Sequence, residues 1–140
     1  MVAESGPRSG ERFGGHPLHR FFGLTLEEAR PGYARMRLDT SPNVIGGVGG
    51  SVHGGVLAAL VDIAMLEALF PALTPSDEPA GTADLAITYL RPAFGPSIWA
   101  EAEVLRKGRQ LAVVEVAISN GEGALCAKGR VLYALRQRER

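Results

Sequence analysis

The chain has 140 residues, which is the size of one domain with a hydrophobic core of its own. Fifteen Lys and Arg residues balance fifteen Asp and Glu residues, so no overall charge draws the chain to nucleic acid or to an anionic membrane. Because Cys126 is the only cysteine, an intramolecular disulfide is excluded, and we expect a soluble protein of the reducing cytoplasm.

The beginning of the chain is polar and glycine-rich. We therefore expect residues 1–15 to be a disordered leader and residues 16–140 to form a single domain. The segment HPLHRFF (16–22) predicts a short turn of helix that sets its aromatic pair on the core. Two strands are expected next, joined at the turn dipeptide Pro31-Gly32; they cover residues 24–28 and 33–40.

A glycine-rich loop over residues 41–52 leads into the most apolar part of the chain, where we expect a helix over residues 55–70 that ends at Pro71. A second loop is expected over residues 75–81. Turn signals then separate four candidate strands, at residues 82–90, 97–107, 111–120 and 124–135.

The predicted helix is apolar nearly all round, unlike a surface helix with one apolar stripe. Such a helix must be enclosed, and two strands precede it while four follow. The simplest enclosure is a curved antiparallel sheet wrapped around one long central helix. The sequence therefore predicts an α+β fold of this kind.

Asp62 is a carboxylate inside this apolar helix, where burial is costly unless the group is paired or lies at a wet cleft. Three interpretations compete: a structural hydrogen bond at solvent or a subunit boundary, one half of an ion pair, or a functional base or nucleophile. Glu67, five residues on, is expected to be a solvated or interface charge.

His53 stands just before the helix, followed by Gly54 and Gly55. At a helix N-terminus, unpaired backbone N–H groups and the positive end of the dipole can receive an anion. The oxyanion that forms when a thioester or ester carbonyl is attacked is such an anion. The alternative is that the glycines only permit a tight turn.

Other chemistries lack their motifs. The glycine loop matches neither phosphate-binding pattern, and no G-x-S-x-G elbow is present. His16 and His19 have no third ligand nearby, so we expect no metal site. Cys126 lies in an apolar run and is expected to be a packing residue.

Nine residues separate His53 from Asp62, about 13 Å along a helix. One small carbonyl group cannot touch both within a single chain. If both serve one reaction, the site must combine two subunits, which predicts a two-fold homodimer.

The run HGGVLAALVDIA (53–64) and the later TADLAITYLRPA (82–93) resemble the hotdog-fold acyl-CoA thioesterases of the PaaI type. The resemblance covers nearly the whole chain after the leader. Because hotdog dimers associate in more than one way, it leaves open a homodimer or a tetramer built from two dimers. It implies a hotdog fold and hydrolysis of acyl-CoA to free acid and CoA, with no cofactor beyond the CoA of the substrate and with acyl-CoA as the partner.

Carried over to this chain, the resemblance gives Asp62 the role of general base or nucleophile and Gly54 or Gly55 that of oxyanion donor. His53 would help to orient the site, and Thr82 would position the water or the carboxylate from the Asp62 side of the dimer.

The family often has an asparagine six residues before the histidine, where this chain has Gly47. Taking residues 47–50 as an insertion makes Asn43 the candidate and the loop a longer rim over the acyl site. The phosphates of CoA need local cations, and the candidates are Arg91, Lys107 and Arg109.

Two other functions stay open at this point: an acyl-thioester hydratase or dehydratase, and a non-catalytic acyl-CoA-binding protein. Small helix residues such as Ala58 and Ala59 leave room for an aromatic or medium-chain acyl group, or only let the sheet pack closely.

Overall fold

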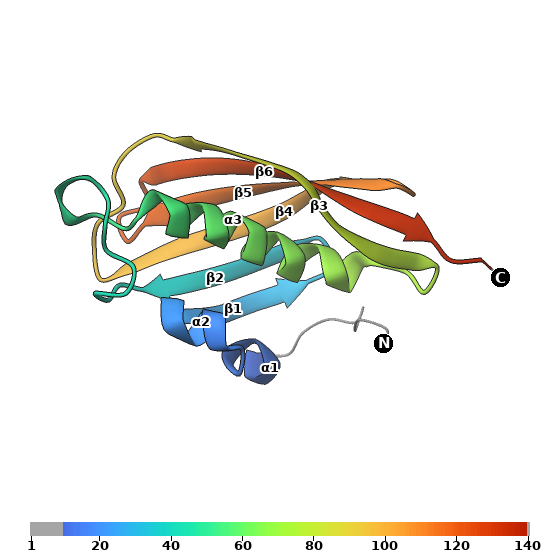
Figure 1. Ribbon diagram of the computed structural model, residues 1–140, viewed down its shortest axis with the longest axis horizontal. Coiled ribbons are helices and arrows are strands. Elements are labelled where there is room, and N and C mark those ends of the chain that lie inside the picture. Colours follow the sequence, from blue (N-terminus) through green and yellow to red (C-terminus); the bar gives the residue numbers. More distant parts are fainter. Residues whose placement is uncertain (1–9, 140) are drawn as a thin grey trace.

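Six antiparallel strands form one curved sheet around a single long helix in the computed structural model, which describes residues 10–139 (Figure 1). The predicted fold class is confirmed. The elements in chain order are α1 (Gly10–Gly14), α2 (Pro17–Phe22), β1 (Leu24–Arg30), β2 (Tyr33–Asp39), the 3-10 turn η1 (Val48–Gly50), α3 (Gly54–Leu69), the 3-10 turn η2 (Phe70–Ala72), β3 (Asp77–Tyr89), β4 (Ser97–Lys107), β5 (Leu111–Asn120) and β6 (Leu125–Gln137).

The strand order across the sheet is β1-β2-β4-β5-β6-β3, and every neighbouring pair is antiparallel. Two edges result, one at β1 and the other at the 13-residue strand β3. The helix α3 lies across one face of the sheet (Figure 1). The core is therefore the layer between α3 and this inner face of the sheet.

The helix α3 begins one residue before the prediction and ends where Pro71 cannot continue it. With the following turn, Gly54–Ala72 is apolar and long enough to cross a membrane by length and composition alone, but 56% of this stretch is buried inside the fold. The segment is the core helix, as its apolar surface on all sides predicts.

The strands present alternate side chains to the helix. In β2, Ala34, Met36 and Leu38 are at most 1% exposed, as the alternation in the sequence predicts. In β6, a Cβ at Gly129 would lie 2.6 Å from a methyl group of Val61. A glycine at this position therefore lets the helix approach the sheet closely.

The prediction of a disordered leader is wrong for residues 10–15. Gly10–Gly14 form the short helix α1, and Phe13 is 1% exposed. The His19 ring contacts Phe13, and its Nδ1 lies 2.9 Å from the Phe13 carbonyl oxygen. A single aromatic residue thus anchors a segment whose composition is otherwise polar; residues 1–9 lie outside the described part of the chain.

Three smaller expectations also need correction. Phe21 points outward and is 53% exposed, so only Phe22 of the aromatic pair packs against the core. The loop expected over residues 75–81 is already strand from Asp77 onward, because β6 extends to Gln137 and pairs with it. Glu67 is 2% exposed rather than solvated, since five residues turn it about 140° round the helix from Asp62.

Asp77 is 1% exposed and explains why β3 starts early. Its Oδ2 accepts from Thr74 N–H at 2.8 Å and lies 2.7 Å from Lys107 Nζ, while Gln137 Nε2 donates to Oδ1 at 2.9 Å. Burial alone would raise the pKa of Asp77, but the bonds from Lys107, Thr74 and Gln137 outweigh burial and hold the pKa well below its usual range.

We expect Asp77→Ala to lower the free energy of unfolding by about 1–3 kcal/mol, because the buried carboxylate that accepts bonds from the partly exposed Lys107 and Gln137 is removed. The native pKa is depressed, so this stabilisation is complete above the ordinary Asp pKa of about 3.9 and is lost as the pH falls below it. Urea unfolding between pH 7 and pH 3 should show a steep acid loss in the wild type and a flatter profile in the variant. Equal stabilities at pH 7 would contradict this role.

Candidate active site

His53 caps the N-terminus of α3. Its backbone is extended, with φ −56° and ψ 132°, and its Nδ1 accepts the Gly55 N–H at 2.8 Å. An accepting Nδ1 places the proton of the neutral ring on Nε2. The His53 N–H donates to the Val44 carbonyl at 2.7 Å, which fixes the entry of the chain into the helix.

Gly54 is the first residue of α3, and its two backbone groups differ in their partners. Its carbonyl accepts the Tyr89 hydroxyl at 2.7 Å. Among the hydrogen bonds of residues 10–139, none uses the Gly54 N–H. Of the two candidate oxyanion donors, Gly55 is thus occupied by His53, and Gly54 keeps a donor at the positive end of the helix.

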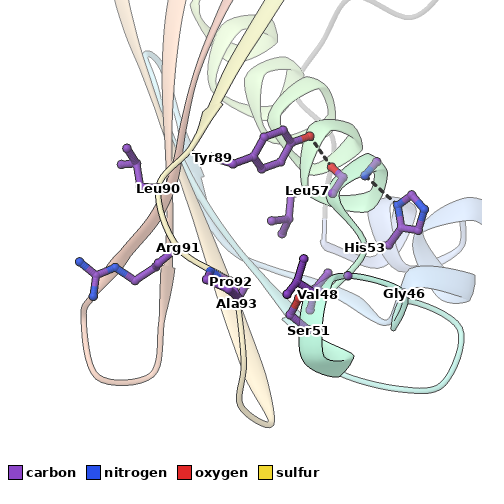
Figure 2. A pocket seen from close by; sticks show the side chains of 14 residues that line it. Gly46, Val48, Ser51, His53, Leu57, Tyr89, Leu90, Arg91, Pro92 and Ala93 are labelled. Atoms are coloured by element: carbon purple, nitrogen blue, oxygen red, sulfur yellow. Dashed lines mark hydrogen bonds between the residues drawn. The ribbon is translucent and has the colours of Figure 1, made fainter.

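A pocket of about 510 Å³ opens at this helix start (Figure 2). Its walls are the glycine loop, the first turn of α3 and the end of β3 with the residues after it. They comprise Gly46, Gly47, Val48, Ser51, Val52, His53, Gly54, Gly55, Leu57, Tyr89, Leu90, Arg91, Pro92 and Ala93. Most of these side chains are apolar, and the backbone N–H groups of the helix start lie at one wall. The pocket therefore suits a ligand that has an apolar part next to a polar group.

The glycine loop forms a small closed bulge at the rim. Gly46 and Gly47 both donate their N–H to the Ser51 carbonyl, and Ile45 bridges Val52. A Cβ at Gly47 would lie 2.3 Å from Ser51 Oγ, so no residue larger than glycine fits where the two ends of the loop meet. Val48 at the tip is 81% exposed. The loop thus holds an apolar side chain over the pocket.

Asp62 lies further along α3 and does not line this pocket. Its side chain is half-buried, and Thr82 Oγ1 from β3 donates to Asp62 Oδ1 at 2.7 Å. The structure therefore brings Asp62 and Thr82 together within one chain. Eight residues of helix, about 12 Å, separate Asp62 from Gly54. One chain holds the acid and the oxyanion donor too far apart to touch the same carbonyl.

Asn43 is not brought into the pocket. Its Nδ2 donates to the Phe21 carbonyl at 3.0 Å, which ties the loop to the end of α2. The neighbouring Val44 contacts the His53 backbone, so Asn43 is close to His53 along the chain while its amide is used elsewhere.

The three candidate cations lie in different places. Arg91 lines the pocket, donates from Nε to the Leu125 carbonyl and points its guanidinium away from His53 (Figure 2). Lys107 is bound to Asp77 and serves the fold. Arg109 lines a separate cleft beside the β4–β5 turn, at the opposite end of the sheet (Figure 1).

The remaining histidines have structural contacts. His16 Nδ1 caps α2 by accepting the Leu18 N–H, and its ring stacks on His19 at 4.3 Å. Within residues 10–139, no three His, Cys, Asp or Glu side chains gather as metal ligands would.

Tyr89 is the site residue that the sequence interpretation missed. It closes one wall of the pocket and bonds to the helix start from a distant strand. Its place at the end of the TADLAITYLRPA segment, within a strand that alternates inward and outward residues, is the signal that could have found it.

Comparison with known proteins identifies the family of the chain. A family model described as Thioesterase superfamily matches residues 49–127, more than half of the chain. The medium/long-chain acyl-CoA thioesterase YigI of Salmonella typhimurium is 31% identical over 138 residues, covering 89% of this chain and 89% of its own. Human acyl-coenzyme A thioesterase 13 is 35% identical over 109 residues, or 76% of each chain. The crystal structure of zebrafish thioesterase superfamily member 2 superposes with a TM-score of 0.70 at 28% identity, covering 87% of this chain and 89% of that chain. The chain therefore belongs to the Thioesterase superfamily, and its fold is the hotdog fold.

Proposed function

We propose that this protein hydrolyses acyl-CoA thioesters to a free acid and CoA. The observation that carries the proposal is a pair of half-sites on α3. One is the carboxylate of Asp62, oriented by Thr82, and the other is the Gly54 N–H, which no residue of 10–139 uses and which lies beside an apolar pocket. Two relatives that align with 89% and 76% of this chain are named as acyl-CoA thioesterases.

In the proposed reaction the thioester carbonyl oxygen accepts the Gly54 N–H. With Asp62 as general base, the carboxylate takes a proton from water, and the water oxygen attacks the carbonyl carbon. The oxyanion forms at the end of the helix, where the dipole and the N–H stabilise it. When it collapses, the C–S bond breaks, and the CoA sulfur takes the proton from Asp62.

The alternative is that Asp62 itself attacks as a nucleophile. The carboxylate oxygen then forms a mixed anhydride with the acyl group as CoA leaves, and water hydrolyses the anhydride. Both routes need the same placement of Asp62 and Gly54 and release the same products.

For the substrate, we propose a medium- to long-chain acyl group, the class named for YigI. The apolar walls around Leu57, Leu90 and Val48 suit the apolar part of such a substrate. Arg91 is the cation that lines this pocket, so we assign it, rather than Lys107, to the phosphates of CoA.

The separation of the half-sites supports a homodimer, and the edge strand β3 offers a way to build it. This strand has one unpaired side over 13 residues, a surface suited to antiparallel pairing with a second copy. Two such dimers associating would give a tetramer.

The contacts of β3 suggest the register of this pairing. Thr82 pairs with Tyr133 of β6, and Tyr89 pairs with Ala127. Measured along β6, Thr82 and Tyr89 are therefore separated by six residues. The midpoint is Arg130, whose partner is Ala86. A two-fold axis beside Ala86 would set Thr82 of one chain opposite Tyr89 of the next. Asp62 would then approach the Gly54 of the partner subunit.

This register predicts that Ala86→Cys subunits form an intersubunit disulfide under mild oxidation. Ala86 is exposed on the outer face of the edge strand, and residues directly opposite in an antiparallel pair have Cα atoms about 4.5–5.5 Å apart. Non-reducing gel electrophoresis measures the fraction of covalent dimer.

The matched control is Thr88→Cys on the same exposed face. Its two copies would lie about 14 Å apart along the paired strands, too far for a disulfide. The native Cys126 is buried, and burial raises the pKa of its thiol, so it should not react. A dimer linked through Thr88→Cys but not Ala86→Cys would overturn the register.

The activity itself is tested by thiol release from aromatic, medium-chain and long-chain acyl-CoAs. We expect release to be fastest with medium- or long-chain substrates. Tight binding without thiol release would instead indicate an acyl-CoA-binding protein. Addition of water to an unsaturated acyl-CoA without thiol release would indicate a hydratase.

A further inference from the structure

The peptide unit between Gly54 and Gly55 is held at both ends. Its N–H, on Gly55, donates to His53 Nδ1 at 2.8 Å, and its carbonyl, on Gly54, accepts the Tyr89 hydroxyl at 2.7 Å. Figure 2 shows the two bonds on either side of the first helical turn. One partner comes from the residue that caps the helix, and the other from a strand 35 residues later in the chain.

Tyr89 also touches Gly54 with its ring. Two ring carbons, Cζ and Cε1, and the hydroxyl oxygen lie 3.4–3.5 Å from the point that a Cβ at Gly54 would occupy. The side chain is nevertheless 52% exposed, so burial in the core does not account for its position. Its recorded contacts point instead to a role at the helix start.

Two adjacent glycines give the backbone at that helix start more conformational freedom than other residues would, because neither has a side chain to restrict it. An oxyanion donor is effective only when it already points to the place where charge develops. A misplacement of about 1 Å can cost a hundredfold in rate. The start of α3 therefore needs an external restraint if Gly54 is to act as the donor.

We propose that Tyr89 is a positioning residue for the Gly54 N–H. By fixing the Gly54 carbonyl from β3, it sets the direction of the first peptide units of α3 without touching the reacting atoms. Because β3 also carries Thr82, one strand orients both the acid of its own chain and the oxyanion donor. This inference rests on the proposed hydrolysis.

The test is Tyr89→Phe, which removes the hydroxyl and keeps the ring. We expect kcat for thiol release to fall about 5- to 10-fold, the effect of losing one hydrogen bond that matters in the transition state. KM should stay within about twofold, because the pocket wall is unchanged. Thr88→Val, which removes a hydroxyl from the outward-facing neighbour, should leave kcat and KM at their wild-type values.

A second experiment, a double-mutant cycle with Gly54→Pro, distinguishes a role of Tyr89 in positioning the Gly54 N–H from a general effect on the structure. If Tyr89 acts through the Gly54 N–H, Tyr89→Phe should have no further effect in a Gly54→Pro background, where that N–H is absent. An unchanged kcat in the single variant, or a full additional loss in the Gly54→Pro background, would overturn the inference. Absence of thiol release from the wild type would instead contradict the proposed function itself.

Discussion

Replacing Asp62 with asparagine is expected to lower kcat for thiol release about 100- to 10,000-fold, the range lost when a general base is removed. Asparagine keeps the shape of the side chain, and its carbonyl oxygen can still accept the Thr82 hydroxyl that now donates at 2.7 Å. It cannot take a proton from water or attack a thioester. The fold and the dimer should therefore survive while the chemistry stops.

Thiol release and thermal unfolding, measured side by side, check this expectation. Asp84→Asn is the matched control, because Asp84 is an exposed carboxylate on the opposite face of β3 from Thr82. The control should keep wild-type turnover. Near-normal turnover of Asp62→Asn would remove Asp62 from the mechanism.

Gly54→Pro is expected to lower kcat/KM about 100- to 1,000-fold, the effect of removing one oxyanion donor. Proline lacks the N–H, yet it is well tolerated at the first position of a helix. The preceding residue, His53, already has the extended backbone that a following proline requires. The substitution should thus remove the donor while α3 still begins at the same residue.

Gly54→Ala is the control, since alanine adds a Cβ at the same place but keeps the N–H. The added carbon would lie 3.4 Å from the Tyr89 ring, an ordinary contact, so we expect at most a severalfold loss. Equal losses for alanine and proline would show that space at Gly54, and not its N–H, limits the reaction.

The arrangement of one helix inside a curved sheet was predictable, because the apolar helix is the clearest feature of the sequence. A helix that is apolar nearly all round has to be enclosed, and a curved sheet built from the six predicted strands is the simplest way to enclose it. The bounds of β4 and β5 were predicted to the residue, since Gly108 and the Asn120-Gly121 turn mark their ends. The start of β3 was missed because Asp77 and Glu78 have the composition of a loop. That segment is a strand because its backbone pairs with the end of β6, and the bonds of buried Asp77 to distant Lys107 and Gln137 support this pairing.

The residues of the site that lie near one another in sequence were predictable. The contacts that the fold makes between residues distant in sequence were not. His53, Gly54 and Asp62 stand out because a histidine, two glycines and a carboxylate interrupt an apolar segment. The occupation of the Gly55 N–H by His53 depends on a rotamer, and the bond from Tyr89 depends on the register of β3 against β6. No local pattern encodes either. The role of Lys107 also follows from a long-range contact, with Asp77.

The central claim is that each site combines Gly54 of one subunit with Asp62 of another. The most direct measurement is thiol release from mixed Asp62→Asn and Gly54→Pro subunits, with subunit exchange confirmed by native mass spectrometry. Each variant alone should be nearly inactive. In a random mixture half of the dimers are hybrids, and each hybrid has one intact site of two, so we expect about a quarter of wild-type activity to return. No recovery despite confirmed exchange would contradict a site shared between subunits.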